Sequence, residues 1–201
     1  MDRCYGAILH KEMDRMNVYD FDKTIYKADS TLDFYLFSLK RYPLIIRYLP
    51  IQTAWVLKYK AKACSKEEMK EHFFVFLKDI QKMESHLERF WDIHEKKIQS
   101  WYLNQKKEDD LIISASPDFL LEPIMKRCKI RHWLATGVNR HTGYFQTPNC
   151  YGEEKVTRLR QRYPQAVIHD FYSDSRTDTP LANLADKAYL VTKGKLIEWT
   201  L

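Results

Sequence analysis

Glycine, proline and cysteine are scarce in this sequence. The 201 residues include 5 glycines and 7 prolines, too few for a collagen-like, low-complexity or disordered chain. The 4 cysteines form no CxxC pair and no ligand spacing with the 7 histidines, which argues against a zinc site or a disulfide framework. We therefore expect an ordinary globular protein whose thiols are free, in a reducing compartment.

Segments that would carry the chain into or across a membrane are also missing. Residues 1–15 carry charges throughout, so they lack the apolar run of a secretory signal. The most apolar stretch, residues 44–57, is interrupted by Arg47, Pro50 and Gln52, and it is shorter than the roughly 20 apolar residues that span a bilayer. These features predict a cytoplasmic protein without a transmembrane helix.

What the sequence does contain is apolar material for one substantial core and an excess of positive charge. Hydrophobic residues make up 45% of the chain, and 33 Lys and Arg against 27 Asp and Glu give a net charge of +6. The length favours one core with an inserted subdomain. The charge favours an anionic partner, which could be a phosphorylated metabolite, an anionic lipid surface or a nucleic acid.

The first predicted strand is short and ends in carboxylates. Asn17-Val18-Tyr19 reads as a buried strand that leads directly into Asp20 and Asp22, with a turn after them. Before residue 17 neither helical nor strand periodicity is clear. We therefore expect residues 1–16 to be a dispensable leader.

Residues 31–105 show helical periodicity without a comparable strand candidate. Ser65 to Glu68 has the spacing of a capping box, and the apolar residues after it recur every three or four positions. A second stripe of this kind follows from Leu87 to Tyr102. Such stripes are more typical of helix packing than of a ligand site, so this segment is predicted to be a helical cap.

The second half alternates between strands and helices. Leu111-Ile112-Ile113 predicts a buried strand that ends at Ser114, and Ser116 is predicted to be the N-cap of a helix whose first residue is Pro117. Further elements are predicted as strands near 132–135 and 166–171, a hairpin at 141–144 and a helix over 153–162. The pattern predicts an α/β fold with a Rossmann-like, mostly parallel sheet flanked by helices, formed by residues 17–30 and 106–201, and an inserted all-helical cap at 31–105.

Polar side chains follow several of these strands in an order that makes chemical sense. The candidates are Asp20 and Asp22 after the first strand, Ser114 after the second, Lys155 near a helix start, and Asp174 and Asp178 after a later strand. Each signal alone is weak, since Asp is common in turns and a serine hydroxyl at a strand end is usually a helix cap. Together they combine carboxylates suited to Mg²⁺ with donors suited to phosphoryl oxygens. The set predicts a site for phosphoryl transfer.

This order, DxDxT, strand serine, lysine and DxxxD, resembles the four motifs of the haloacid dehalogenase-like hydrolases. It is most similar to the branch with a helical cap between the first two motifs, subfamily IB, which includes phosphoserine phosphatases. The resemblance extends from Asn17 over nearly the whole remaining chain. It implies a phosphatase that uses Mg²⁺ and an aspartyl-phosphate intermediate.

The first motif would supply the reactive carboxylates. The resemblance implies that Asp20 is the nucleophile and a metal ligand, and that Asp22 is the general acid and base with its main-chain carbonyl on the metal. Thr24 would be structural. A carboxylate is a competent nucleophile where a cation neutralises both it and the incoming phosphate, and a covalent intermediate divides one difficult displacement into two.

The later motifs would bind the phosphoryl group and complete the metal site. By the same resemblance Ser114 and Lys155 hold phosphoryl oxygens and Asp174 ligates Mg²⁺. Asp178 would lie beside the metal, where it would orient the ligands or contact the metal through water. Without the other motifs, a lone lysine at position 155 would be read as part of a solvated helix face.

The substrate is left open between a lipid head group and a soluble metabolite. Phosphoserine phosphatases usually carry Gly-Gly after the motif-two serine and an acidic residue soon after motif one, where this chain has Ala115-Ser116 and Tyr26-Lys27-Ala28. The stretches 150–156, 172–175 and 178–181 are more similar to phosphatidylglycerophosphatase C-like enzymes. That resemblance implies a lipid phosphate such as phosphatidylglycerophosphate, with a soluble phosphoserine-like or sugar phosphate as the alternative.

Two further readings concern surfaces. Leu44, Tyr48, Ile51, Trp55 and Tyr59 fall at helical spacings beside basic residues, which suggests a peripheral contact with the inner membrane face, although the same stripe could pack on other cap helices. The basic, aromatic stretches also suggest a nucleic-acid-binding module. That reading leaves the ordered acidic motifs unexplained, so no nucleic-acid partner is expected.

Overall fold

The computed structural model describes residues 15–200 of the chain. A six-stranded sheet forms its centre, with the strand order β3-β2-β1-β4-β5-β6. The strands are β1 (Arg15–Tyr19), β2 (Leu111–Pro117), β3 (His132–Thr136), β4 (Val167–Ser173), β5 (Ala185–Thr192) and β6 (Lys195–Glu198). All neighbouring pairs are parallel except β5 and β6, so the predicted α/β fold with a mostly parallel sheet is confirmed.

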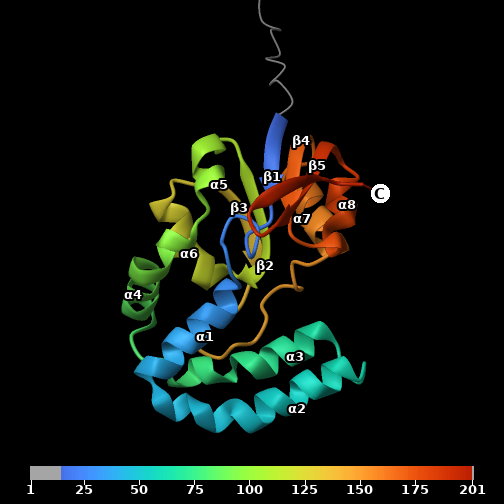
Figure 1. Cartoon of the computed structure of the whole chain (residues 1–201). Coiled ribbons are helices and arrows are strands. Elements are labelled where there is room, and N and C mark those ends of the chain that lie inside the picture. The colour runs from blue at the N-terminus through green and yellow to red at the C-terminus, as the bar shows by residue number, and fades with distance from the viewer. Residues whose placement is uncertain (1–14, 201) are drawn as a thin grey trace, which may run out of the picture.

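The residues of the inner strands alternate between two apolar clusters, one on each face of the sheet. Val18, Leu111 and Ile113 face a cluster that α7 (Glu153–Arg162) and α8 (Thr179–Ala182) cover. Tyr19 and Ile112 face the larger cluster on the opposite side. Successive side chains of a strand point to opposite faces, so apolar residues at adjacent positions require helices on both faces. Figure 1 shows the resulting three layers.

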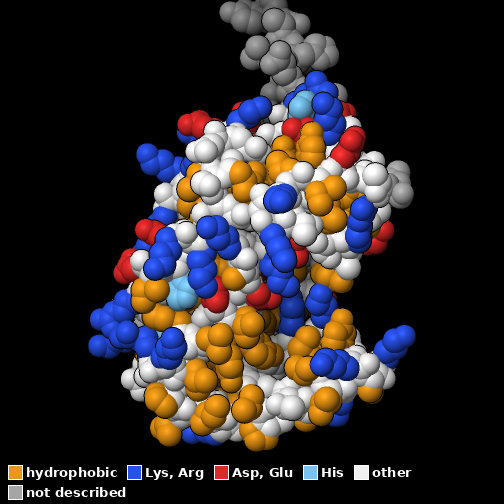
Figure 2. All heavy atoms as spheres, in the orientation of Figure 1, with side chains coloured by type: hydrophobic (Ala, Val, Ile, Leu, Met, Phe, Trp, Pro, Cys, Tyr) orange, Lys and Arg blue, Asp and Glu red, His pale blue; other side chains and the backbone are white. Residues whose placement is uncertain are grey.

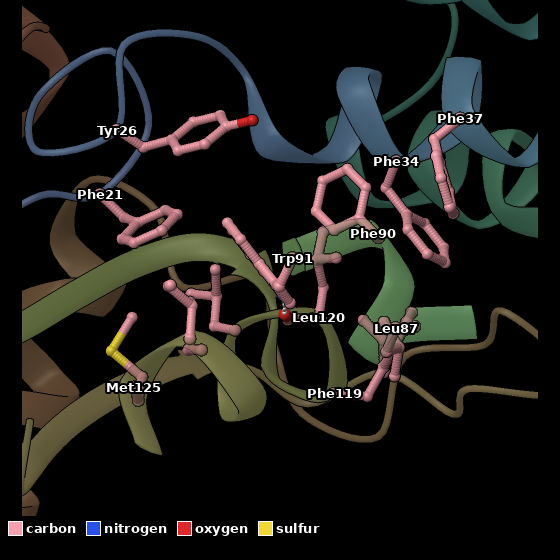
Figure 3. Close-up of a cluster of buried hydrophobic side chains, with 14 of the residues drawn as sticks. Phe21, Tyr26, Phe34, Phe37, Leu87, Phe90, Trp91, Phe119, Leu120 and Met125 are labelled. Carbon is pink, nitrogen blue, oxygen red and sulfur yellow. Dashed lines mark hydrogen bonds between the residues drawn. The ribbon is translucent and has the colours of Figure 1, made fainter. Parts of the chain in front are cut away.

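The larger cluster is built by α6 (Asp118–Arg127), α4 (Met83–His94), α5 (Ser100–Gln105) and the loop after β1. Trp91 is fully buried there, and its indole nitrogen donates a hydrogen bond to the carbonyl of Leu120 at 2.8 Å. Figure 3 shows the indole between the stacked rings of Phe21 and Tyr26 and the side chains of α6. This packing holds the loop that carries Asp20 and Asp22 against the sheet.

Residues 30–105 contain only helices, as the periodicity predicts. They form α1 (Ser30–Arg41), α2 (Leu49–Lys60), α3 (Lys66–Phe73), α4 and α5, with 3₁₀ segments η1 (Pro43–Tyr48), η2 (Phe74–Asp79) and η3 (Glu95–Lys97). The capping box of Ser65 and Glu68 is formed. In Figure 1 α2 and α3 lie away from the sheet, whereas α4 and α5 pack on the larger cluster. Residues 30–105 therefore contribute both to the layer that covers the sheet, through α4 and α5, and to the cap, through α2 and α3.

Two local predictions differ from the structure. Strand β1 begins at Arg15, two residues earlier than predicted, and Met16 is buried and paired with Ile168 of β4, so residues 15 and 16 belong to the sheet. The rest of the predicted leader lies outside the described residues. Ser116 is not a helix N-cap, because β2 continues to Pro117 and α6 starts at Asp118. The Ser116 hydroxyl donates a hydrogen bond to Asp22 instead.

Candidate active site

The polar residues predicted from the motifs meet at the carboxyl end of the sheet. Asp20 follows β1, Asp174 follows β4, and Ser114 lies in the middle of β2, which pairs with β1. The main-chain nitrogen of Asp20 donates to the carbonyl of Tyr172 at 2.8 Å, which fixes the loop against β4. Ligands of open α/β sheets bind at this edge, where neighbouring strands send their loops apart.

A buried lysine joins two of the carboxylates. The Lys155 ammonium donates to Asp20 Oδ1 at 2.6 Å and to Asp178 Oδ2 at 2.7 Å, and the Lys155 side chain is only 2% exposed. Gly152 precedes α7 with φ +59° and ψ −127°, a conformation that is essentially confined to glycine. This glycine lets the chain enter α7 in the direction that sends Lys155 inward.

The buried charges around Lys155 do not balance. One ammonium serves two carboxylates, and Asp178 Oδ1 is buried without a hydrogen-bond partner within the described residues. Burial raises the pKa of Asp20 to about 7, because the attraction of Lys155 only partly offsets desolvation and Asp178 adds repulsion. Burial alone would lower the pKa of Lys155, but Asp20 and Asp178 outweigh it and raise that pKa. The site therefore has an excess of buried negative charge.

The second carboxylate of the first motif is held by separate donors. Asp22 Oδ1 accepts from the main-chain nitrogen of Ser30 at 2.7 Å, and Oδ2 accepts from the Ser116 hydroxyl. Burial, followed by repulsion from Asp29, raises the pKa of Asp22 to about 6. A carboxyl group of this kind can hold a proton near neutral pH and release it, as general acid–base chemistry requires.

Thr24 and Asp174 link the first motif to β4. The Thr24 hydroxyl donates to Asp20 Oδ2 at 3.3 Å and accepts from the main-chain nitrogen of Asp174 at 2.9 Å. The Asp174 side chain lines the cavity beside Asp20, and burial raises its pKa. Thr24 therefore has the structural position that the sequence predicts for it.

A cavity of about 450 Å³ lies over these groups. Its floor is formed by the motif residues Asp20, Asp22, Lys155, Asp174 and Asp178, and its roof by residues of α1, α3 and η2. Ser114 does not border this cavity. Its hydroxyl is buried within β2 and accepts from the main-chain nitrogen of Ser116 at 3.1 Å, whereas Ser116 itself lines the cavity.

Sequence reasoning missed several residues of this cavity. Lys66 and Lys70 reach it from α3, and Asp29 reaches it from the N-terminus of α1. Asp29 also corrects the expectation drawn from Tyr26-Lys27-Ala28, because an acidic side chain does follow the first motif. The i, i+4 spacing of the two lysines on the polar side of α3 was the available signal.

Helix α3 is fastened to the core beside this cavity. Lys70 donates to the carbonyl of Ala115 and to Asn149 Oδ1, both at 2.9 Å. Glu67 accepts from the main-chain nitrogen of Asn149 at 2.7 Å, and the Lys66 ammonium lies 3.3 Å from the centre of the Tyr151 ring. Burial, followed by repulsion from Lys66, lowers the pKa of Lys70 to about 8. The roof is thus bound through polar contacts.

A bound divalent cation fits the donors on the floor. Among residues 15–200, no three His, Cys, Asp or Glu side chains are gathered closely enough to hold a metal by themselves. The Asp22 carboxylate is turned toward Ser30 and Ser116, which leaves its main-chain carbonyl as the oxygen for a metal, beside Asp20 and Asp174. The uncompensated negative charge and the hard oxygen donors suit Mg²⁺.

The sequence model of one family, described as haloacid dehalogenase-like hydrolase, matches residues 18–183. The chain belongs to the haloacid dehalogenase-like hydrolase family. This confirms the family predicted from the four motifs, and with it the prediction of a hydrolase. None of the curated proteins compared with the chain matches it.

Solved structures share the fold of this hydrolase. A protein with unknown function from Bordetella pertussis Tohama I has a TM-score of 0.73 at 20% identity, over 88% of this chain and 89% of the other. A phosphoserine phosphohydrolase-like protein from Francisella tularensis has a TM-score of 0.54 at 16% identity, over 88% and 86%. A substrate-bound phosphoserine phosphatase has a TM-score of 0.53 at 11% identity, over 87% and 84%. At these identities the likeness establishes the fold alone.

Proposed function

We propose that this hydrolase is a phosphatase that transfers the phosphoryl group of a phosphomonoester to Asp20. The observation that carries the proposal is the ammonium of Lys155, shared by Asp20 and Asp178 at the floor of the cavity. Phosphoryl transfer requires a nucleophile among fixed positive charges, because the group transferred is itself anionic.

In the proposed reaction an Asp20 carboxylate oxygen attacks phosphorus while the bond from phosphorus to the ester oxygen breaks. Asp22 gives its proton to the departing alkoxide, for which a pKa of about 6 is suited. Asp22 then accepts a proton from the water that attacks the aspartyl phosphate, which releases phosphate and restores Asp20. Ser30 and Ser116 keep the Asp22 side chain in place through both steps.

The remaining motif residues would bind the phosphoryl oxygens and the cation. Lys155 would donate to one oxygen. Ser114, the second donor predicted from the motifs, has a hydroxyl hydrogen to offer but would have to become accessible from the cavity, which it does not border in this structure. Mg²⁺, when bound to Asp20, Asp174 and the Asp22 carbonyl, would neutralise charge on the phosphoryl group and on its nucleophile. Asp178 would orient Lys155.

For the substrate we favour a phosphomonoester whose leaving group carries further negative charge, as a lipid phosphate such as phosphatidylglycerophosphate does. Lys66 and Lys70 line the roof of the cavity and support this choice. Asp29 lines the same cavity and supports the second candidate, a soluble phosphomonoester with an amine, such as phosphoserine. The three cysteines among the described residues are free thiols, in keeping with the cytoplasmic location we propose.

The proposal is tested by assaying phosphate release from a panel of phosphomonoesters with Mg²⁺ and with a chelator. We expect Mg²⁺-dependent release, with lipid and glycerol phosphates ahead of phosphoserine. Beryllofluoride, which mimics a phosphoryl group on a carboxylate, should bind the wild type and not Asp20→Asn. Equal turnover by the wild type and Asp20→Asn would contradict the aspartyl-phosphate mechanism.

A further inference from the structure

The outer surface of the cap displays apolar side chains that no part of the described chain covers. Exposed fractions reach 76% for Leu44, 59% for Leu57 and 49% for Ile46. On α2 the exposed positions Pro50, Ala54 and Leu57, with Ala61 at its C-cap, follow one another at helical spacings. Figure 2 shows hydrophobic side chains gathered over the lower part of the molecule, where α2 and α3 lie. We call the outer face of η1 and α2 the apolar face.

The structure corrects which residues form this face. Trp55 does not point outward, because its ring stacks on His72 of α3 with 3.7 Å between ring centres. Gln52 is buried and bonds to Tyr35 and to the carbonyl of Phe73. These two residues attach α2 to the rest of the cap. Among the remaining apolar side chains of α2, Leu49, Ile51 and Leu57 are exposed and available to another surface.

The segment that carries the apolar face has charged residues of one sign. Residues 34–65 include six basic residues and no Asp or Glu. Removing these six from the 33 basic residues leaves 27, equal to the 27 acidic residues, so this segment accounts for the whole net charge of +6. All six are exposed, namely Lys40, Arg41, Arg47, Lys58, Lys60 and Lys62. Arg47 is paired with Asp79, and no ion pair among residues 15–200 involves the other five.

We propose that the apolar face of η1 and α2 docks onto the surface of an anionic lipid bilayer. A helix with an exposed apolar stripe can bury that stripe among acyl chains, and lysines on both sides of the stripe can then contact the negative head groups. Two copies of the face would repel one another through their like charges, which disfavours a self-pair. None of the helices within residues 15–200 is long and apolar enough to cross a bilayer, so the contact is peripheral.

In the docked protein, helices α2 and α3 would lie between the cavity and the lipid surface. Helix α3 packs on α2, and its other side lines the cavity through Lys66 and Lys70. The cavity then lies about one helix layer, roughly 10 Å, above the docked face. This inference does not depend on the proposed phosphatase activity.

Co-sedimentation with phosphatidylcholine vesicles, with and without added phosphatidylglycerol, tests the docking. We expect the wild type to sediment with the anionic vesicles at low salt and to be released at high salt. The pair Leu44→Ser with Leu57→Ser should abolish sedimentation. Lys58→Gln with Lys60→Gln should weaken it by about fivefold for each lysine removed.

Matched controls come from the opposite end of the molecule. Leu196→Ser with Ile197→Ser removes exposed apolar side chains from β6, and Lys187→Gln with Lys195→Gln removes exposed charges near that strand. Both controls should sediment like the wild type. Asp20→Asn should also sediment, which separates docking from catalysis. The proposal would be overturned if the wild type stayed in the supernatant with both kinds of vesicle. It would also be overturned if the wild type formed a dimer in solution that the double variant Leu44→Ser, Leu57→Ser no longer formed.

Discussion

Helices α2 and α3 lie side by side in the cap but use opposite chemistry. Helix α3, with the sequence KEEMKEHF, binds the core through Lys66, Glu67 and Lys70. Helix α2, with the sequence LPIQTAWVLKYK, buries Gln52 and leaves most of its apolar side chains exposed. This difference is what the two proposals require, with α3 facing the substrate cavity and α2 facing a lipid surface outside the protein. The experiments below test this contrast, beginning with the chemistry beneath α3.

The largest effect is expected from Asp20→Asn, which removes the proposed nucleophile while keeping its volume. Turnover should fall by at least about a thousandfold, because no other group can form the covalent intermediate. Phosphate release under saturating substrate measures it. Asp109→Asn changes an exposed carboxylate away from the cavity and should leave turnover unchanged. If both variants lost activity equally, the site would have to lie elsewhere.

Lys155→Met should destabilise the protein as well as inactivate it. Without the ammonium, Asp20 and Asp178 would remain buried next to each other, at a cost of roughly 3 kcal/mol in the free energy of unfolding. Denaturant unfolding without added metal measures this. Adding Asp178→Asn to Lys155→Met should recover part of the stability but not the activity. Lys126→Met, on an exposed face of α6, is the matched control.

The roof of the cavity should decide which substrate is preferred. Lys66→Gln is expected to raise KM about tenfold for a doubly anionic substrate and much less for phosphoserine. Asp29→Asn should do the reverse, and since Asn is also a good N-cap, α1 should remain intact. The ratio of the two KM changes distinguishes the two candidate substrates. Equal effects on both substrates would mean that the roof does not discriminate between them.

The smallest effect concerns the interior of the cap. His86 is buried with its ring nitrogen 2.9 Å from the Ser38 hydroxyl, and burial, aided by Arg41, lowers its pKa to about 4. The folded protein then keeps His86 neutral at pH values where the unfolded chain takes up a proton. Its contribution to stability should therefore fall as the pH drops from about 6.5 to about 4. His86→Gln should flatten this part of the curve of stability against pH, and an unchanged slope would contradict it.

Much of the molecule could be predicted from local patterns. The strands around Val18, Ile112 and Ile168 are short apolar runs followed by polar residues, and helix 153–162 has the predicted bounds because its periodicity is unbroken. The positions of Asp20 and Lys155 followed from motif order. These features depend on residues close together in the sequence, for which side-chain periodicity is a sufficient guide.

Ser116 and Asp29 show what local patterns could not supply. A serine before a proline reads as a helix cap, but the hydroxyl of Ser116 instead binds Asp22, which is distant in sequence. Asp29 is the N-cap of α1, and the same side chain lines the cavity because α1 starts at its edge. The contact of Ser116 with Asp22 and the position of Asp29 at the cavity both depend on which strands are neighbours in the sheet.

The sequence by itself determined the family, the strand and helix pattern and the motif carboxylates, because each is recorded in spacing along the chain. The tertiary structure alone decided that Lys155 is shared between Asp20 and Asp178, since these residues come from three different segments. It also decided that Trp55 packs on His72 while Leu57 faces outward. A helical stripe gives the spacing of its residues, but only the packing of a neighbouring helix fixes which side is buried.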